Sequence, residues 1–393
     1  MKILMANFTK MVGDTGGLAK VTCAFSNALI RRGHEVSLIY SDEREGAFFF
    51  PVDEKLKCYN LKRNADGSVI RFPLHLKAYR EILRAFDKRS ARTVNDDFEE
   101  KKLLPNLKRY LEEIRPDIII SYQLAASKLL LCDLKTDIPV ITMSHGDPSD
   151  YFETYPFKEI PSLAKSAMCQ VLMPSFEKCI TDKVPEAKTV TIGNAIPQFD
   201  FSADLASEKK QYKIIFVGRL TKNHKRPHLL LQAFVKLTEK HPDWILELWG
   251  ARDRKAYYKE LEMLASSKAL EGRVFLKGST NDVGSVLREA DIFAFPSAYE
   301  GFGMAMAEGM SVGLPAVGYR NCPAVNELVE DGKTGFLCED GVDPLAEALD
   351  KLMSDRDLRI RMGTAAKIAM EQYAPEKIWD KWEELINEVV RGE

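Results

Sequence analysis

Short apolar runs alternate with longer amphipathic segments along most of the chain. Residues 2–6, 117–121 and 139–143 are almost wholly apolar, as strands buried on both faces of a parallel sheet are. A segment with helical periodicity, residues 18–32, follows the first run. The pattern returns at residues 213–217, 245–249, 274–277, 291–295 and 315–318. This alternation predicts an α/β protein with doubly wound parallel sheets.

A polar stretch interrupts the alternation near the middle of the chain, and 393 residues are too many for one ordinary core. We therefore predict two Rossmann-like domains that face a central cleft. The predicted parts are an N-terminal domain at 1–195, a linker at 196–210, a second domain at 211–375 and a final amphipathic helix at 376–393.

One segment, residues 62–92, departs from this pattern because it is rich in Lys and Arg. An apolar stripe recurs there at helical spacing, formed by Leu76, Tyr79, Ile82, Leu83 and Phe86. The first interpretation is a solvated helix docked on the first domain. The alternative is a surface that touches anionic lipid.

Composition excludes several classes of protein. A formal net charge of −2 argues against a nucleic-acid binder, and no apolar run reaches the roughly 18 residues of a membrane span. The segment Met1–Phe8 predicts a strand and not a signal peptide, and the seven scattered cysteines favour reduced, buried thiols. We therefore expect a cytoplasmic protein, with the inner face of the cell membrane as a peripheral location.

Two carboxylates bracket a glycine-containing turn in the second half of the chain. The segment is Glu300-Gly-Phe-Gly-Met-Ala-Met-Ala-Glu308, and its candidate ligand-binding residues are Glu300, Gly301, Phe302, Gly303, Met304 and Glu308. The glycines permit close approach of a ligand, and the N-terminus of the following helix favours an anion. This arrangement suits a sugar nucleotide, with hexose hydroxyls at Glu300, ribose hydroxyls at Glu308 and the diphosphate between them.

A basic loop follows the first strand of the second domain. Gly218 and Arg219 end that strand, and Lys225 lies further along the same loop. Arginine offers a planar fork of donors and lysine a compact charge, so both suit a diphosphate at the carboxyl edge of the sheet.

The first domain contributes three further candidates. Gly16 and Gly17 precede the first helix, where they predict either a phosphate-binding loop or a structural turn. His145 follows a strand, so a role in the cleft and a role in the core are equally open. Asp96-Asp97 is interpreted as a solvated charge cluster. We therefore expect no metal and no cofactor, with the nucleotide sugar as co-substrate.

Together these residues resemble a family-4 retaining glycosyltransferase of the GT-B fold. The resemblance is strongest over residues 213–340, and includes Gly218-Arg219, Lys225, Phe295-Pro-Ser-Ala-Tyr-Glu300-Gly-Phe-Gly and Glu308. It implies that Arg219 and Lys225 bind the donor diphosphate and that His145 assists catalysis near the donor sugar. It also implies a final helix that crosses back to the first domain. The interval from Gly218 to Lys225 is one residue longer than the commonest family spacing, so Lys222 or Arg226 could share the phosphate role.

The resulting hypothesis is a metal-independent, retaining hexosyltransferase. It would use a nucleotide-diphosphate sugar, by family habit a UDP-sugar, and a glycan or lipid-linked acceptor in cell-envelope polysaccharide biosynthesis such as that of lipopolysaccharide. The alternatives are a GT-B nucleotide-sugar epimerase and a non-catalytic protein that binds sugar nucleotides.

Overall fold

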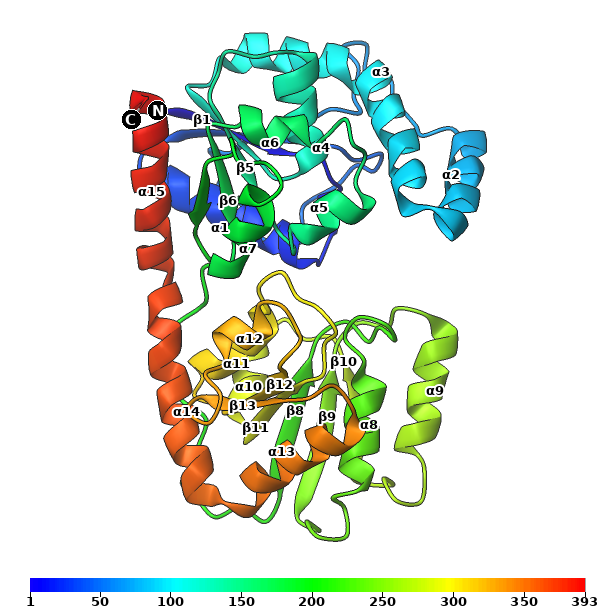
Figure 1. The fold of residues 1–393 in the computed structure, drawn as a ribbon, viewed down its shortest axis with the longest axis vertical. Helices are drawn as coiled ribbons and strands as arrows, with labels where there is room; N and C mark the ends of the chain where they lie inside the picture. Colours follow the sequence, from blue (N-terminus) through cyan, green and yellow to red (C-terminus); the bar gives the residue numbers. More distant parts are fainter. Residues whose placement is uncertain (393) are drawn as a thin grey trace. The chain divides into compact units, whose positions relative to one another are not determined.

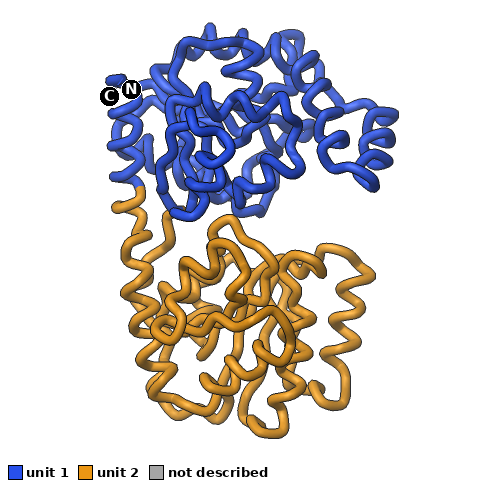
Figure 2. The backbone as a smooth tube through the Cα atoms, in the orientation of Figure 1, with its two compact units in different colours: residues 1–193, 379–393 blue, residues 194–378 orange. Residues whose placement is uncertain are grey.

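The computed structural model describes residues 1–392, and the chain divides into two compact units (Figure 1). Unit 1 comprises Met1–Gly193 together with the chain from Trp379 onward, and unit 2 comprises Asn194–Ile378 (Figure 2).

Unit 1 is built on a seven-stranded parallel sheet with the order β3-β2-β1-β4-β5-β6-β7. Its strands are β1 (Lys2–Asn7), β2 (Glu35–Tyr40), β3 (Lys57–Asn60), β4 (Ile118–Ser121), β5 (Val140–Met143), β6 (Met168–Val171) and β7 (Thr189–Thr191). The predicted parallel sheet is confirmed. Strand β3 was not predicted, because an edge strand of sequence Lys-Cys-Tyr-Asn has neither an apolar run nor a buried face.

The helices of unit 1 connect these strands. They are α1 (Gly17–Arg31), α2 (Leu74–Phe86), α3 (Lys88–Ile114), α4 (Leu124–Lys128), the π-helical turn η1 (Leu129–Asp133), α5 (Ser149–Thr154), α6 (Pro161–Lys165) and α7 (Pro174–Thr181).

Unit 2 repeats this architecture with a six-stranded parallel sheet of order β10-β9-β8-β11-β12-β13. Its strands are β8 (Tyr212–Val217), β9 (Trp244–Trp249), β10 (Val274–Gly278), β11 (Ile292–Phe295), β12 (Ala316–Tyr319) and β13 (Gly335–Cys338). Its helices are α8 (Pro227–Val235), α9 (Lys255–Ala265), α10 (Val283–Arg288), α11 (Met304–Ser311), α12 (Val325–Leu328), α13 (Val342–Ser354), α14 (Arg356–Met370) and the 3-10 turn η2 (Glu371–Tyr373).

The segment 196–210 has no regular secondary structure and packs on unit 2. The Ile196 N–H donates to the Tyr373 carbonyl at 2.8 Å, and the Ala203 N–H donates to the Val312 carbonyl at 2.8 Å. The Leu205 side chain is buried.

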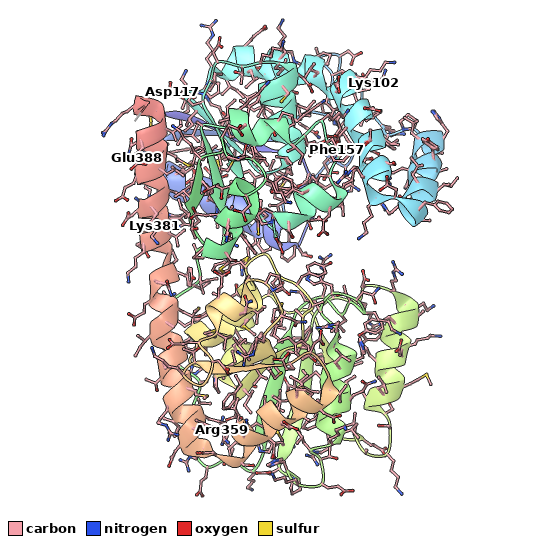
Figure 3. All side chains as sticks on the ribbon, viewed as in Figure 1. Lys102, Asp117, Phe157, Arg359, Lys381 and Glu388 are labelled. Carbon is pink, nitrogen blue, oxygen red and sulfur yellow. The ribbon has the colours of Figure 1, made fainter. Side chains whose placement is uncertain are left out.

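Deep in unit 2, α14 carries a buried arginine, Arg359, which is labelled in Figure 3. Its Nη1 donates to the Leu352 and Met353 carbonyls at 2.7 and 3.1 Å, and its guanidinium lies over the rings of Tyr212 and Trp244. These contacts attach α14 to α13 and to the strands β8 and β9.

The last helix, α15 (Pro375–Arg391), begins in unit 2 and ends in unit 1. Within unit 1, Trp379 stacks on Phe25 with ring centroids 5.1 Å apart, and Trp382 lies 4.7 Å from the same ring. His34 pairs with Glu383 at 2.9 Å at the edge of this contact. The buried aromatic rings supply most of the attachment, since ion pairs near the surface contribute little.

The basic segment forms α2 and the start of α3, and Figure 1 shows α2 at the outer edge of unit 1 beside α3. Leu76 and Leu83 are half-buried against α3, whereas Tyr79, Ile82 and Phe86 are exposed. The predicted apolar stripe is therefore divided: one edge docks on unit 1 and the other faces outward. Across residues 1–392 the structure contains no helix long and apolar enough to cross a bilayer.

The interpretation of Asp96-Asp97 as a solvated cluster is wrong for Asp96. Asp97 is exposed and pairs with Lys158, but Asp96 is buried and hydrogen-bonds to the buried Glu159. Burial and the Asp96 charge raise the pKa of Glu159 to about 9, so the two carboxyl groups share a proton at neutral pH.

Candidate active site

The candidate residues of unit 2 meet where the strand order reverses. Strand β8 lies between β9 and β11, so the loops that leave the carboxyl ends of β8 and β11 are neighbours at the edge of the sheet. Open α/β sheets bind ligands at this point. The loop after β8 carries residues 218–226 and the loop after β11 carries residues 296–303.

Glu300 lies at the centre of these two loops and is only 8% exposed. Its Oε1 is 2.5 Å from Lys225 Nζ and 3.5 Å from His224 Nε2. Burial opposes ionisation of Glu300, but the hydrogen bond from His224 and the charge of Lys225 outweigh it, so its pKa lies below the ordinary value. Glu300 is thus a carboxylate at neutral pH, ready to accept hydrogen bonds from hydroxyl groups.

The four cations of the β8 loop are held differently. The Arg219 side chain is exposed and forms no ion pair within the described part of the chain. Lys222 pairs with Glu260 at 2.8 Å, and Arg226 pairs with Asp340 at 2.8 Å. Of these four cations, Lys225 contacts Glu300 and Arg219 lies just after β8, whereas Lys222 and Arg226 are engaged with other acids.

Two glycines allow the ends of β8 and β9 to approach each other. A Cβ on Gly250 would lie 1.8 Å from the Gly218 carbonyl oxygen, a distance that no side chain tolerates, and Gly250 also has φ of +155°. Gly218 lies against the Lys225 stem, and a Cβ there would be 3.6 Å from two of its methylene carbons. Sequence reasoning missed Gly250, whose only local signal is its place directly after a strand.

The turn after Glu300 leads into α11 as predicted. Gly303 has φ of +83° and precedes the first residue of the helix, Met304, with no side-chain cap on the helix N-terminus. Glu308 lies one helical turn further on and is buried, while Gly301 lies in the turn itself. The Phe302 ring packs edge-on against Tyr373 with centroids 5.0 Å apart, so its side chain belongs to the core.

In unit 1, Gly16 and Gly17 lie at the N-terminus of α1. Gly16 is the N-cap residue, and its N–H donates to Asp14 Oδ1 at 2.9 Å. Asp42 anchors the same loop, since its Oδ2 accepts from the N–H groups of Met11 and Val12. The loop is therefore positioned by hydrogen bonds on both sides, and sequence reasoning missed Asp42 because its partners lie about 30 residues away.

His145 follows β5, and its ring stacks on Tyr122 with centroids 5.1 Å apart. Its Nε2 is buried and has no hydrogen-bond partner among residues 1–392. Burial lowers the pKa of His145 to about 4, so the imidazole is neutral at pH 7.

The aromatic residues after His145 pack on their own unit. The Tyr151 hydroxyl donates to Ser144 Oγ at 3.0 Å, and the Arg92 guanidinium lies 3.8 Å from the Tyr155 ring centre. Phe157, labelled in Figure 3, is covered on one face by Arg89.

Up to residue 392, the chain brings together no group of three His, Cys, Asp or Glu side chains that could coordinate a metal ion.

Comparisons with known families agree with this architecture. Residues 15–196 match the model described as Glycosyltransferase Family 4, and residues 197–369 match the model described as Glycosyl transferases group 1. The chain belongs to the family 4-like glycosyltransferases of the GT-B fold.

Individual proteins resemble the chain over its full length. An uncharacterized glycosyltransferase of Haemophilus influenzae is 26% identical over 389 residues, which is 96% of this chain and 98% of that protein. The fold is also that of sucrose-phosphate synthase from Thermosynechococcus elongatus (TM-score 0.78, 16% identity, 100% of both chains). HepE from Anabaena, solved with UDP and glucose, has a TM-score of 0.70 at 18% identity, covering 98% of this chain and 99% of that one. At these identities the two solved structures support the fold alone.

Proposed function

We propose that this glycosyltransferase is a metal-independent, retaining enzyme that transfers a hexose from a UDP-sugar to a hydroxyl group of a glycan or glycolipid in cell-envelope polysaccharide synthesis. The observation that carries the proposal is the group at the carboxyl ends of β8 and β11. There Arg219, which forms no ion pair with any residue up to 392, and a Lys225–Glu300 pair lie on the loops that lead into α8 and α11. Uridine is proposed as the base because the chain belongs to this glycosyltransferase family, whose members commonly use UDP-sugars; HepE of Anabaena, which shares the fold, was solved with UDP and glucose.

The proposed donor pose follows from the charges of these residues. The diphosphate accepts hydrogen bonds from Arg219, from Lys225 and from the N-terminus of α11. The hexose hydroxyls donate to the Glu300 carboxylate, and the ribose hydroxyls donate to Glu308. Cationic side chains and backbone N–H groups then neutralise the leaving diphosphate without a metal ion.

Retention of configuration requires attack on the face of the sugar from which the diphosphate leaves. The bond from the anomeric carbon to the phosphate oxygen breaks, and a bond from that carbon to the acceptor oxygen forms on the same face. The acceptor proton moves to the departing phosphate oxygen, where Arg219 and Lys225 stabilise the charge. His145 is neutral at pH 7 and assists in this proposal as a hydrogen-bonding group, without carrying a charge.

The test combines donor screening with product analysis. A thermal-shift panel of UDP-, GDP- and ADP-sugars is followed by acceptor screening with the best stabiliser, and the anomeric configuration of the product is read by NMR. An α-configured product from an α-configured donor, formed equally in chelator, supports the proposal. Inverted product refutes retention, loss of activity in chelator refutes metal independence, and donor turnover without acceptor indicates an epimerase. Binding without release of nucleotide indicates a non-catalytic protein.

We further propose that the exposed face of α2 contacts an anionic membrane, which would place the enzyme at the inner face of the cell membrane beside a lipid-linked acceptor. Phe86 is 87% exposed and Ile82 is 61% exposed, and they lie on one face of the helix. Lys77 and Lys88 are exposed beside this face and have no ion-pair partner within residues 1–392. Apolar side chains bordered by cations are typical of helices that lie in the headgroup region.

Vesicle sedimentation tests this surface. We expect the protein to sediment with phosphatidylglycerol-containing vesicles and not with pure phosphatidylcholine, and binding to weaken with salt. The double variant Ile82→Ser/Phe86→Ser should reduce binding by at least about tenfold. Met263→Ser, which removes an exposed side chain of unit 2, is the matched control. Equal binding by wild type and the double variant contradicts the proposal.

A further inference from the structure

We infer that His224 is a positioning residue for Glu300, and that the stacked pair of His224 and Tyr299 thereby determines how tightly the sugar part of the donor is bound. The inference rests on the proposed function, in which Glu300 accepts hydrogen bonds from the hexose. Neither His224 nor Tyr299 belongs to the candidate site as the sequence defines it.

Three contacts attach His224 to the loop that carries Glu300. The His224 carbonyl accepts from the Ala298 N–H at 2.8 Å, and His224 Nε2 lies 2.9 Å from the Tyr299 carbonyl oxygen. The imidazole also stacks on the Tyr299 ring, with centroids 4.2 Å apart and planes inclined by 1°. These contacts join the β8 loop to the β11 loop one residue before Glu300.

The contact with the Tyr299 carbonyl determines which imidazole nitrogen of His224 carries the hydrogen. A carbonyl oxygen can only accept, so the hydrogen must be on Nε2 of His224. The same nitrogen lies 3.5 Å from Glu300 Oε1, the oxygen that Lys225 also contacts, so its N–H faces the carboxylate as a second, longer contact. The carboxylate is therefore held through Oε1 by two consecutive residues of the β8 loop, and its orientation follows from theirs.

One face of the Tyr299 ring is open to solvent. Tyr299 is 54% exposed although one face of its ring is covered by His224. The stacked Tyr299 ring restricts rotation of the imidazole, and the Tyr299 carbonyl holds its Nε2. Together they keep Nε2 of His224 close to Glu300.

A second histidine on the same segment makes a different contact and serves as a matched control. His228 lies at the start of α8, its Nδ1 is 2.8 Å from the Tyr257 hydroxyl, and the two rings meet edge-on. Both histidines therefore combine an aromatic neighbour with one side-chain hydrogen bond, but only His224 contacts Glu300.

The experiment compares the affinity for a sugar nucleotide with the affinity for its free nucleotide. Calorimetry is performed with the best-binding member of a UDP-, GDP- and ADP-glucose panel, and with the corresponding nucleoside diphosphate. His224→Phe keeps an aromatic ring but removes the N–H. We expect it to weaken binding of the sugar nucleotide by about tenfold, the loss expected for one hydrogen bond to a charged group. Binding of the free nucleotide should change by less than about twofold, because it does not use Glu300.

Two further readouts separate positioning from a general structural effect. His224→Gln places an N–H on a side chain that reaches nearly as far, and should recover part of the lost affinity. Removal of the N–H also disfavours the Glu300 carboxylate, so the pH below which the sugar nucleotide dissociates should rise in His224→Phe and not in His228→Phe.

The outcomes are distinguishable. If the wild type binds none of the three sugar nucleotides, the proposed function fails, and this inference fails with it. If the wild type binds one of them and His224→Phe leaves the ratio of the two affinities unchanged, only the inference is overturned. Equal losses of both affinities also overturn it, since they indicate a damaged nucleotide site.

Discussion

The Lys225–Glu300 pair provides a quantitative test of how the site is held together. Lys225→Met keeps the stem that covers Gly218 but removes the charge 2.5 Å from a carboxylate. The side chains are 13% and 9% exposed, so Glu300 would remain buried without its main counter-charge. Breaking a buried pair from one side costs about 3–5 kcal/mol. Because His224 remains nearby, we expect a loss at the lower limit, about 3 kcal/mol in the free energy of unfolding of unit 2.

Differential scanning calorimetry can detect this loss. For a domain of about 150–250 residues, the range that includes unit 2, each kcal/mol moves the Tm by about 2–4 °C, so we expect a decrease of about 6–12 °C. Lys222→Met is the matched control. Lys222 and Glu260 are 53% and 43% exposed, and an exposed pair is expected to contribute less than about 1 kcal/mol.

The same pair predicts a dependence on pH. In the wild type the pKa of Glu300 lies below its ordinary value of 4.5, so the stabilisation is present above that value and is lost as the pH falls through the lowered pKa. The difference in Tm between the wild type and Lys225→Met should therefore narrow in acid. The double variant Lys225→Met/Glu300→Gln should lose less than the sum of the single losses, by about 1–3 kcal/mol.

Two results would refute this reasoning. One is a Tm for Lys225→Met within 2 °C of the wild type, roughly the change allowed for the exposed Lys222 control. The other is additivity of the two single substitutions, which would mean that the charges do not interact.

Three further predictions concern other parts of the fold. Glu159 has a pKa raised to about 9, so the folded protein keeps a proton that the unfolded chain releases, and the stability that this group contributes falls as the pH rises from about 5 to 9. Glu159→Gln should remove that decline in a plot of Tm against pH. Parallel curves for the wild type and the variant would contradict a proton shared with Asp96. Trp382→Ala removes a buried ring from its contact with Phe25 and should lower the free energy of unfolding of unit 1 by about 3–5 kcal/mol, measured by urea unfolding. A loss below about 1 kcal/mol would show that other contacts hold α15. Gly250→Ala would place a methyl group against the end of β8, so we expect calorimetry to show a lower Tm and a weaker affinity for the donor. An unchanged affinity would show that this contact does not position the β8 loop.

Much of the candidate site follows from local sequence. The segment from β11 to Glu308 combines a strand, a glycine-containing turn and a helix in fewer than twenty residues, so its local conformation could be predicted from neighbouring residues. Gly303 adopts the left-handed conformation and α11 begins directly after it, as this sequence predicts. The divided stripe of α2 was only half predictable, because periodicity defines an apolar face without saying which edge of it finds a partner.

The contacts that hold the site depended on strand order, which local patterns do not encode. Arg226 and Asp340 lie 114 positions apart and Lys225 and Glu300 lie 75 apart, yet both pairs form because β8, β11 and the later strands leave the same edge of one sheet. Asp96 looks solvated by its polar neighbours, and only the packing of α3 buries it beside Glu159. The amino-acid sequence by itself therefore determined the class of fold and the chemical groups available, because strand, helix and turn preferences act over a few residues. The tertiary structure alone decided which of those groups meet, because hydrogen bonds and ion pairs require approach within about 3–4 Å, and only the assembled sheet brings distant segments that close.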